Sequence, residues 1–272
     1  GCDKQSKTHR EKTGHDRLLC SRFLDHPCLT FISKHLDCVG LCSPFGSEMV
    51  FSPLFPKVDW WLYWGLPGRC ATNLLCDHLV ILFGTMQVYL VRHTTPQVAA
   101  GTCYGQSDIP LNLDLFPKEC AQVISKLPIG LDAWYASTLQ RCTQLAHQIS
   151  PIHQTDTRLM EMNFGDWEMQ KWNDIDADSL KIWSENFVEA RTPNGENYLD
   201  LHARSEDFIA FLLAQKTNKV GIVTHAGNIR SIMSWVLDLP LKNSFRISLP
   251  YGAVVGVEIN INKHYNKLIA IQ

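Results

Sequence analysis

From residue 86 onward, short strand-like runs alternate with helix-like stripes of apolar residues, and this alternation is the strongest constraint on the fold. The runs that predict strands are 88–91, 133–137, 219–225, 252–261 and 267–272. We expect the last two to close the sheet, as a hairpin. Strands that alternate with helices at this spacing form βαβ units, so the pattern predicts an α/β fold: a three-layer α/β/α sandwich with a mainly parallel sheet.

Between the predicted strands, apolar residues recur at the spacing of one helix face. The first stripe consists of Phe116, Cys120, Val123, Ile124 and Leu127. Pro117 lies near its first turn, where a residue without a backbone N–H is tolerated. Similar stripes run through 139–149 and 229–236 and predict two more helices.

Residues 1–85 differ in character from residues 86–272, because they show no sustained period of 3.6 or 2. They contain seven of the ten cysteines but no CxxC pair, and a zinc site at Cys38, Cys42 and a nearby histidine is the less favoured alternative. We expect a poorly ordered N-terminal extension, or sequence upstream of the native start. The functional domain is expected to begin near Met86.

Composition excludes several classes of protein. The formal net charge of −2 argues against a protein that coats nucleic acid. No apolar run reaches the roughly 18 residues of a membrane span, and the first 20 residues lack the pattern of a secretory signal. Only three cysteines follow residue 86, which favours a reducing, cytoplasmic setting without a disulfide framework across the protein. The expected assembly is a monomer or homodimer.

Cationic and imidazole side chains follow three of the predicted strands. Arg92 and His93 come directly after the first, and Arg141 lies in the first turn of the helix after the second. His225 follows the third, and small residues beginning with Ala226 open the next helix. Ligands bind beyond the carboxyl ends of such strands, and arginine forks with helix-end amides suit an anion. The placement therefore predicts a phosphate pocket.

Five segments resemble the motifs of one family, in the same order along the chain. They are "LVRHT", "ASTLQRC", "EMNFGDWE", "PNGEN" and "VTHAGNIR". Together they cover essentially all of residues 86–272 and are similar to the histidine phosphatase, or phosphoglycerate-mutase-like, superfamily. Within it, the chain looks most like the α-ribazole phosphatases, which remove a 5′-phosphate late in cobalamin assembly. Two departures are a threonine after the RH pair and "WEMQ" in place of the more usual "WEG".

The resemblance implies a histidine-phosphatase-like fold and phosphoryl transfer through a phosphohistidine, with no metal and no cofactor. His93 would attack the phosphorus of a small-molecule phosphomonoester. Arg92, Arg141 and His225 would hold the phosphoryl oxygens and offset the charge of the transition state. Water would then release the phosphate from His93.

Three glutamates match or lie near the family's motifs. The resemblance implies that Glu161 is the general acid that protonates the leaving group. Glu168, seven residues further along, is the rival carboxylate for that role. Glu196 in "PNGEN" is expected to be structural, close to the start of a helix.

The loop after His93 is expected to shape the substrate end of the pocket. Thr94, Tyr104 and Gly105 are candidate binding residues there, and Gly105 is expected to offer its backbone amide to the phosphate. Ordinary packing is the alternative for Tyr104. Ala226 is a further candidate, because it follows His225 at the helix start.

Four other functions remain open. A metal-dependent hydrolase would use His93, His225 and Glu161 as ligands, but two arginines at the same rim would repel a divalent cation. A phosphoglycerate mutase usually has a longer insertion between the Glu motif and the second histidine, whereas here the separation is 225 − 161 = 64 positions. A broad-specificity phosphatase and a non-enzymatic phosphate-binding domain complete the alternatives.

Overall fold

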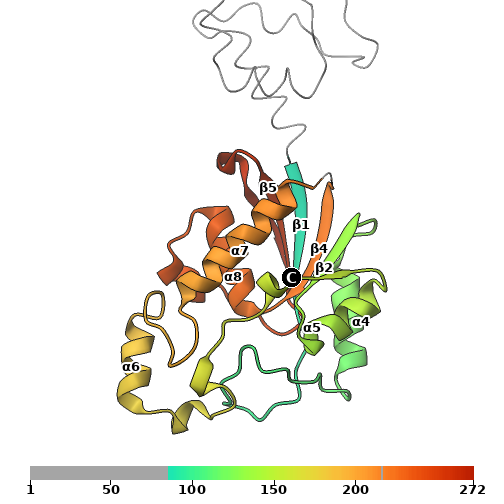
Figure 1. Ribbon diagram of the computed structural model, residues 1–272. Helices are drawn as coiled ribbons and strands as arrows, with labels where there is room; N and C mark the ends of the chain where they lie inside the picture. The colour runs from blue at the N-terminus through green and yellow to red at the C-terminus, as the bar shows by residue number, and fades with distance from the viewer. Residues whose placement is uncertain (1–84, 216) are drawn as a thin grey trace, which may run out of the picture. The chain divides into compact units, whose positions relative to one another are not determined.

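Six strands form one mixed sheet, in the order β3-β2-β4-β1-β5-β6 (Figure 1). The computed structural model describes residues 85–215 and 217–272, so the expectations for 1–84, including a zinc site, lie outside the described residues. The strands are β1 Thr85–Arg92, β2 Ala133–Ala136, β3 Gln154–Thr155, β4 Lys219–Thr224, β5 Val254–Asn260 and β6 Lys267–Ile271. The β3–β2, β2–β4 and β4–β1 pairs are parallel, and β1–β5 and β5–β6 are antiparallel. The mainly parallel sheet and the closing hairpin are confirmed.

Helices cover both faces of this sheet, which confirms the three-layer α/β/α architecture (Figure 1). They are α4 Phe116–Lys126 and α5 Gln140–Ile149 on one side, and α7 Tyr198–Leu213 and α8 Ala226–Leu237 on the other. Along the central strand β1, Val88 and Leu90 pack in the core that includes α7 and α8. Val91 packs in the core that includes α4 and α5. This alternation explains why β1 is apolar on both faces.

The three parallel strands at the centre end almost level with one another. Arg92 at the end of β1 is in register with Thr224 at the end of β4, and Ala136 of β2 is in register with Val223. The backbone N–H of His93 continues the β1–β4 pairing by donating to the Thr224 carbonyl at 3.0 Å. The residues that follow these strands therefore reach the same edge of the sheet.

The segment between β3 and β4 contains structure that the apolar pattern did not predict. It holds α6 Ala177–Glu185, α7, and the short 3₁₀ helices η2 Thr157–Leu159, η3 Gly165–Trp167 and η4 Trp172–Asp174. Two more short helices, η5 Leu241–Arg246 and η6 Lys263–Tyr265, lie near the carboxyl end. Helix α6 packs through Trp183, which stacks on Trp172 with ring centroids 5.9 Å apart, rather than against the sheet. A helix anchored by one aromatic residue leaves no long apolar stripe in the sequence.

Two further findings concern this part of the chain. Among residues 85–215 and 217–272, none of the helices has the length and apolar character needed to cross a bilayer. The cysteines there, Cys103, Cys120 and Cys142, are free thiols in buried positions.

Candidate active site

Two histidines and two arginines meet at the carboxyl edge of the sheet, as the sequence predicted. His93 and His225 lie with their ring centroids 5.2 Å apart. Both rings and the Arg141 side chain are buried, and Arg92 is half-buried. Residues 48 to 133 positions apart in the chain are brought together here because β1, β2 and β4 end at one edge.

The hydrogen bonding of His93 determines which ring nitrogen is free. Its Nδ1 lies 2.7 Å from the Thr94 carbonyl oxygen. A carbonyl only accepts hydrogen bonds, so Nδ1 carries the proton and Nε2 keeps its lone pair. Burial lowers the pKa of His93 well below its usual value, and the neighbouring Arg141 and Arg92 lower it further, although the bond to Thr94 opposes them. His93 is therefore a neutral imidazole near neutral pH, with a nucleophilic nitrogen available.

His225 lies where β4 ends, as the N-cap residue of α8. Its Nε2 is 2.9 Å from the Ser137 hydroxyl and 3.4 Å from the Cys142 sulfur. Burial lowers the pKa of His225 well below its usual value, and Arg141 and then His93 add to the effect. A neutral imidazole in this position can bind a phosphoryl oxygen without placing a third full charge beside the two arginines.

Backbone carbonyls hold both guanidinium groups in place. Arg141 donates to the carbonyls of Gly105 and Ser107, the latter at 2.8 Å, and Arg92 donates to the carbonyl of Leu249. The Nε atoms of both arginines are buried and have no partner within the described residues. Buried donors of this kind fit an anion with several acceptor oxygens, such as a phosphoryl group.

The side chains of Arg92, His93, Arg141 and His225 together form what we call the cradle. Two tyrosines from distant loops lie beside it. The hydroxyls of Tyr104 and Tyr251 are 2.6 Å apart. The Tyr251 ring lies 4.0 Å from the Arg92 guanidinium carbon, and the Tyr104 ring lies 5.4 Å from that of Arg141. Burial raises the pKa of Tyr104, and its bond to Tyr251 adds to this. Tyr104 thus contacts the cradle, whereas the sequence contained no signal for Tyr251, which lies in the loop before β5.

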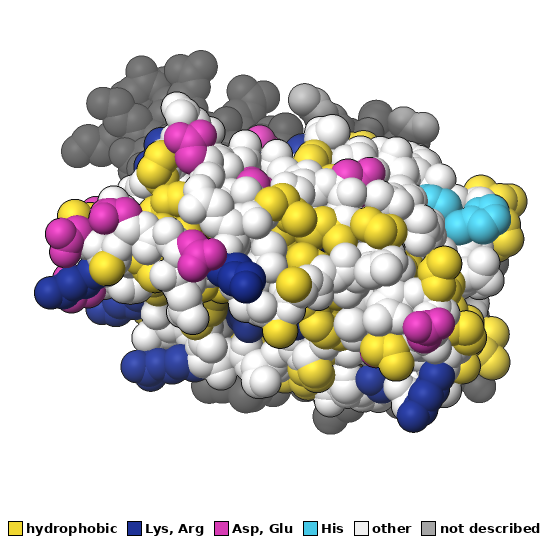
Figure 2. All heavy atoms as spheres, turned by 90° about the horizontal axis from the view of Figure 1, so that it is seen from below, with side chains coloured by type: hydrophobic (Ala, Val, Ile, Leu, Met, Phe, Trp, Pro, Cys, Tyr) yellow, Lys and Arg dark blue, Asp and Glu magenta, His cyan; other side chains and the backbone are white. Residues whose placement is uncertain are grey.

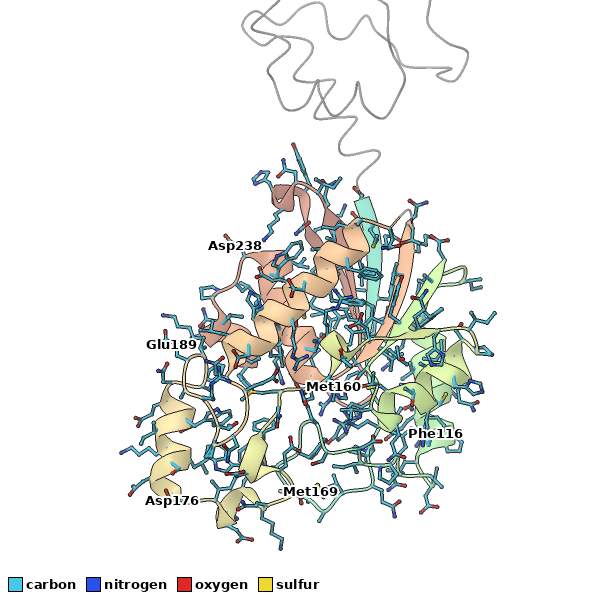
Figure 3. The ribbon with its side chains drawn as sticks, in the orientation of Figure 1. Phe116, Met160, Met169, Asp176, Glu189 and Asp238 are labelled. Atoms are coloured by element: carbon cyan, nitrogen blue, oxygen red, sulfur yellow. The ribbon has the colours of Figure 1, made fainter. Side chains whose placement is uncertain are left out.

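The Glu161 carboxylate is fixed against the first turn of α8. Its Oε1 accepts the N–H of Met162 at 2.9 Å, and its Oε2 accepts the N–H of Gly227 at 3.0 Å. Gly227 is two residues after His225, so the carboxylate lies on the same side of the sheet edge as the phosphate cradle. In Figure 3, Met160, directly before Glu161, lies close to the ends of the strands, and Met169, directly after Glu168, lies in the lower part of the molecule.

Glu168, the rival carboxylate, has other partners. It accepts hydrogen bonds from the backbone N–H groups of Gly105, Gln106 and Ser107. Burial alone would raise the pKa of Glu168, but the bonds from the Ser107 hydroxyl and these N–H groups outweigh it and lower the pKa. An ionised acceptor is unsuited to donate a proton. The N–H of Gly105 therefore serves Glu168, which differs from the expectation that it would face the phosphate.

Glu196 directly precedes the N-cap of α7 and accepts the Asn163 N–H at 2.8 Å. It also pairs with Arg204, whose Nε lies 3.2 Å from the Glu196 carboxylate. Arg204 in turn donates to the carbonyl of Glu161 at 2.9 Å. These contacts match the structural role expected for Glu196, and they hold the backbone that carries Glu161.

A third arginine near the site was not anticipated. Arg230 lies on α8, and its Nε donates to the Ile247 carbonyl at 3.0 Å. Burial lowers the pKa of Arg230, and the charge of the neighbouring Glu161 opposes that. Its position four residues after Ala226 was the available signal, since residues at that spacing share a helix face.

The metal-ligand alternative finds no support in the geometry. Over the stretch of chain the structure describes, no three His, Cys, Asp or Glu side chains are placed to hold a metal ion. Both oxygens of Glu161 accept backbone N–H groups, as noted above, and the positive charges of Arg141 and Arg92 act on both histidines, which disfavours a cation there.

Comparison with known proteins agrees with this geometry. Residues 88–271 match the family model of the histidine phosphatase superfamily (branch 1). The adenosylcobalamin/alpha-ribazole phosphatase of Escherichia coli (strain K12) is 27% identical over 186 residues, which is 64% of this chain and 91% of that protein. The glucosyl-3-phosphoglycerate phosphatase of Mycobacterium tuberculosis (strain ATCC 25618 / H37Rv) is 30% identical over 112 residues, covering 37% of this chain and 50% of that protein.

The fold gives the same result. The crystal structure of the alpha-ribazole phosphatase from Shigella flexneri superposes with a TM-score of 0.62 at 25% identity, covering 68% of this chain and 96% of that one. The family match spans more than half of the chain, and the relatives it resembles are phosphatases. The chain therefore belongs to the histidine phosphatase superfamily, branch 1, and is a phosphoric monoester hydrolase.

Proposed function

We propose that this enzyme removes phosphate through a phosphohistidine on His93, and that its substrate is α-ribazole 5′-phosphate or adenosylcobalamin 5′-phosphate. The observation that carries the first part is the fixed tautomer of His93, whose Nε2 lone pair is free beside Arg92 and Arg141. The second part is supported by the alpha-ribazole phosphatases among the similar proteins.

In the first step, Nε2 of His93 attacks phosphorus in line with the ester oxygen, and the bond from phosphorus to that oxygen breaks. Arg92, Arg141 and His225 hold the other phosphoryl oxygens while charge builds on them. Glu161 donates a proton to the leaving oxygen, which departs as an alcohol. The Thr94 carbonyl accepts from Nδ1–H and stabilises the positive charge that the ring gains.

In the second step, Glu161 takes a proton from water, and the oxygen attacks the phosphorus held on His93. The nitrogen–phosphorus bond breaks, inorganic phosphate leaves, and His93 returns to the neutral form. The covalent intermediate replaces one difficult displacement by two easier ones.

The surroundings of the cradle support a substrate with a flat, partly apolar alcohol portion. The aromatic rings of Tyr104 and Tyr251 border it, and such rings favour stacking on other rings. Figure 2 shows the face beyond the carboxyl ends of the parallel strands, where hydrophobic side chains gather across the middle and charged ones lie mainly toward the margins. The dimethylbenzimidazole ring of α-ribazole suits such a surface.

A broad-specificity phosphatase is the second candidate. The similarity to a glucosyl-3-phosphoglycerate phosphatase supports it, because that protein is named for a sugar-containing substrate. A panel of α-ribazole 5′-phosphate, adenosylcobalamin 5′-phosphate, 3-phosphoglycerate and a sugar phosphate separates the two. The proposed substrate requires kcat/KM for the first two to exceed the others, and similar values for all four would favour broad specificity.

The phosphohistidine route is tested by His93→Ala. This variant should keep its circular dichroism spectrum but lose turnover and acid-labile labelling by substrate carrying radioactive phosphate. His147→Ala is the matched control, since His147 is an exposed histidine outside the cradle. Turnover that survives in His93→Ala would exclude the route.

The proposal also places the enzyme in cobalamin biosynthesis in the cytoplasm, as a monomer or homodimer. The free, buried cysteines of the domain support a reducing compartment. No cofactor enters the steps above.

A further inference from the structure

One carboxylate gathers an unusual number of donors beside the active site. Oε2 of Glu168 accepts the N–H of Gly105 at 2.9 Å, the N–H of Ser107 at 3.1 Å and the Ser107 hydroxyl at 2.6 Å. Oε1 accepts the N–H of Gln106 at 2.9 Å and the N–H of Phe164 at 3.1 Å. Three consecutive residues of the loop after His93 thus point their amides at a single side chain. Bonds to an ionised acceptor are stronger than neutral ones, so this loop segment, 105–107, is firmly held.

The carbonyls of the same segment face the catalytic cradle. The Gly105 and Ser107 carbonyls both accept from the guanidinium of Arg141, the latter at 2.8 Å. Arg141 is fully buried, and these two bonds leave its Nε without a protein partner among the residues described. Segment 105–107 therefore lies between an anion and a cation, with its amides toward Glu168 and its carbonyls toward Arg141.

The backbone around Glu168 is itself fixed to the start of this loop. Cys103 exchanges two bonds with the segment after Glu168: its N–H donates to the Gln170 carbonyl at 2.7 Å, and its carbonyl accepts the Met169 N–H at 2.8 Å. The N–H of Trp172 donates to the Gly101 carbonyl at 2.9 Å. These ladder-like bonds bring Glu168 to segment 105–107 in one defined arrangement.

Gly105 shows how closely the parts fit. A Cβ at this position would lie 1.8 Å from the Met162 carbonyl oxygen and 2.9 Å from Oε1 of Glu168. The backbone can lie this close to Met162 and Glu168 only because this residue has no side chain.

We propose that Glu168 is a positioning residue for catalysis: it fixes the backbone of segment 105–107 so that the Gly105 and Ser107 carbonyls orient Arg141 toward the phosphoryl group. Glu168 does not touch the substrate in this arrangement. The inference rests on the proposed function in one respect, that Arg141 binds the phosphoryl oxygens.

A purely structural role would predict something different. If Glu168 only stabilised the fold, its loss would lower stability without a specific effect on anions bound at Arg141. If it acts through Arg141, its effect on phosphate binding must disappear when Arg141 can no longer use the two carbonyls. Residues that act through one contact are non-additive in this way, whereas independent residues add.

The test measures binding of inorganic phosphate to the full chain by calorimetry. We expect Glu168→Ala to raise the phosphate Kd by about tenfold or more, because a charge-assisted anchor of a binding group is lost. Glu168→Gln keeps one acceptor oxygen and should give a smaller increase. Asp132→Ala is the matched control: Asp132 also accepts two backbone N–H groups, from Asn218 and Lys219, but at the opposite end of the sheet. It should leave the Kd unchanged.

The decisive comparison is a double-mutant cycle with Arg141→Lys, which keeps the positive charge but loses the planar fork. In that background, Glu168→Ala should change the Kd by less than about twofold. In an Arg92→Ala background it should keep its full effect, because Arg92 is held by Leu249 instead. Losses that multiply in the Arg141→Lys background would overturn the inference, as would wild-type phosphate affinity in Glu168→Ala.

These outcomes separate the positioning role from the proposed function, since phosphate binding needs no turnover. A chain that shows the expected cycle but hydrolyses no phosphomonoester contradicts the proposed function alone. Should Glu168→Ala fail to fold by circular dichroism, the cycle is run with Glu168→Gln, whose smaller effect must likewise vanish with Arg141→Lys.

Discussion

Gly227, which has no side chain, leaves the space in which the Glu161 carboxylate lies. A Cβ on Gly227 would be 2.2 Å from Oε1 of Glu161 and 3.1 Å from its carboxyl carbon. We expected the small residues after His225 to let backbone amides approach a bound anion. The structure shows that the Gly227 amide instead holds Glu161. Gly227 therefore provides space for the Glu161 carboxylate at the start of α8.

This contact makes a prediction in which activity and stability separate. Gly227→Ala should lower kcat by about a hundredfold or more, because the new methyl group displaces the Glu161 carboxylate from the leaving oxygen. Stability should change little: the displaced atom is the end of a flexible side chain, and alanine in a helix is favoured over glycine by up to about 1 kcal/mol. Turnover kinetics and urea unfolding of the same preparation test both parts.

Substrates with different leaving groups show whether the expected loss of kcat comes from lost proton donation by Glu161. Glu161→Gln should reduce kcat strongly with an alkyl phosphate but only weakly with p-nitrophenyl phosphate, whose leaving group needs no proton. Equal losses with both substrates would contradict the general-acid role. Gly227→Ala should follow the same pattern as Glu161→Gln.

The site residues that could be predicted from the sequence are those that come directly after a predicted strand. Arg92, His93 and His225 lie where predicted strands end, and adjacent parallel strands place such residues together. Tyr251 could not be found in this way, because its position depends on the path of a loop rather than on any repeating pattern. The contact between Glu168 and segment 105–107 could not be predicted either. The carboxylate binds backbone N–H groups, which every residue except proline has, so the identity of residues 105–107 does not reveal it.

Among the elements, α7 begins with a complete capping box. The Asn197 side chain accepts the Asp200 N–H at 2.9 Å, and the Asp200 carboxylate accepts the Asn197 N–H at 3.0 Å. Glu196, just before the cap, holds Asn163. The start of α7 is therefore tied to the segment that carries Glu161.

Removal of the cap should be measurable in stability. Asn197→Ala is expected to lower the free energy of unfolding by about 1 kcal/mol, because the Asp200 N–H in the first turn of α7 loses its acceptor. Asn197→Asp retains an acceptor at the same place and should cost much less. Urea titrations of both variants provide the comparison, and equal losses would show that the cap is not the cause.

Sequence patterns predicted three of the four helices that pack on the sheet. The helices α4, α5 and α8 bury stripes against β-strands, and their apolar spacing was evident. Two kinds of missed element have other sources of stability: α6 packs through aromatic rings, and the 3₁₀ helices follow loop hydrogen bonds. Long α7 was missed as well, although its buried residues include Leu201, Phe208 and Leu212.

For the whole molecule, buried histidines link stability to pH. The folded-state pKa values of His93 and His225 lie well below the usual 6.5, so the unfolded chain binds more protons below that pH. The free energy of unfolding should therefore be level above about pH 7 and fall as the pH drops below 6.5. The slope reaches about 1.4 kcal/mol per pH unit for each histidine until its folded pKa is reached.

Urea unfolding between pH 7.5 and 5.5 tests this, in a window above the range where carboxylates titrate. His93→Gln should reduce the slope of the unfolding free energy against pH by up to about 1.4 kcal/mol per pH unit, the contribution of one titrating histidine. His202 contributes in the same direction, because its pKa is also lowered by burial. An identical slope in His93→Gln and the wild type would contradict the buried, neutral state of His93.

The extent of the functional unit is a second prediction at this scale. Strand β1 begins at Thr85, whose hydroxyl accepts a bond from the Asn260 side chain at 3.0 Å. We expect a chain of residues 85–272 behind an initiator methionine to fold and to keep full kcat/KM. Failure of this shortened protein to fold would show that the first 84 residues are required.

The central position of β1 in the sheet has a consequence for how the enzyme folds during its synthesis. Leu90 pairs with Ile222, a separation of 222 − 90 = 132 residues, and Val88 pairs with Val257, a separation of 257 − 88 = 169. Contacts so distant in the chain form late, after long loops have closed. Until the ribosome has translated β4 and β5, the strand that leads into His93 lacks both of its neighbours. The two histidines and two arginines at the sheet edge thus come together only when synthesis is nearly finished.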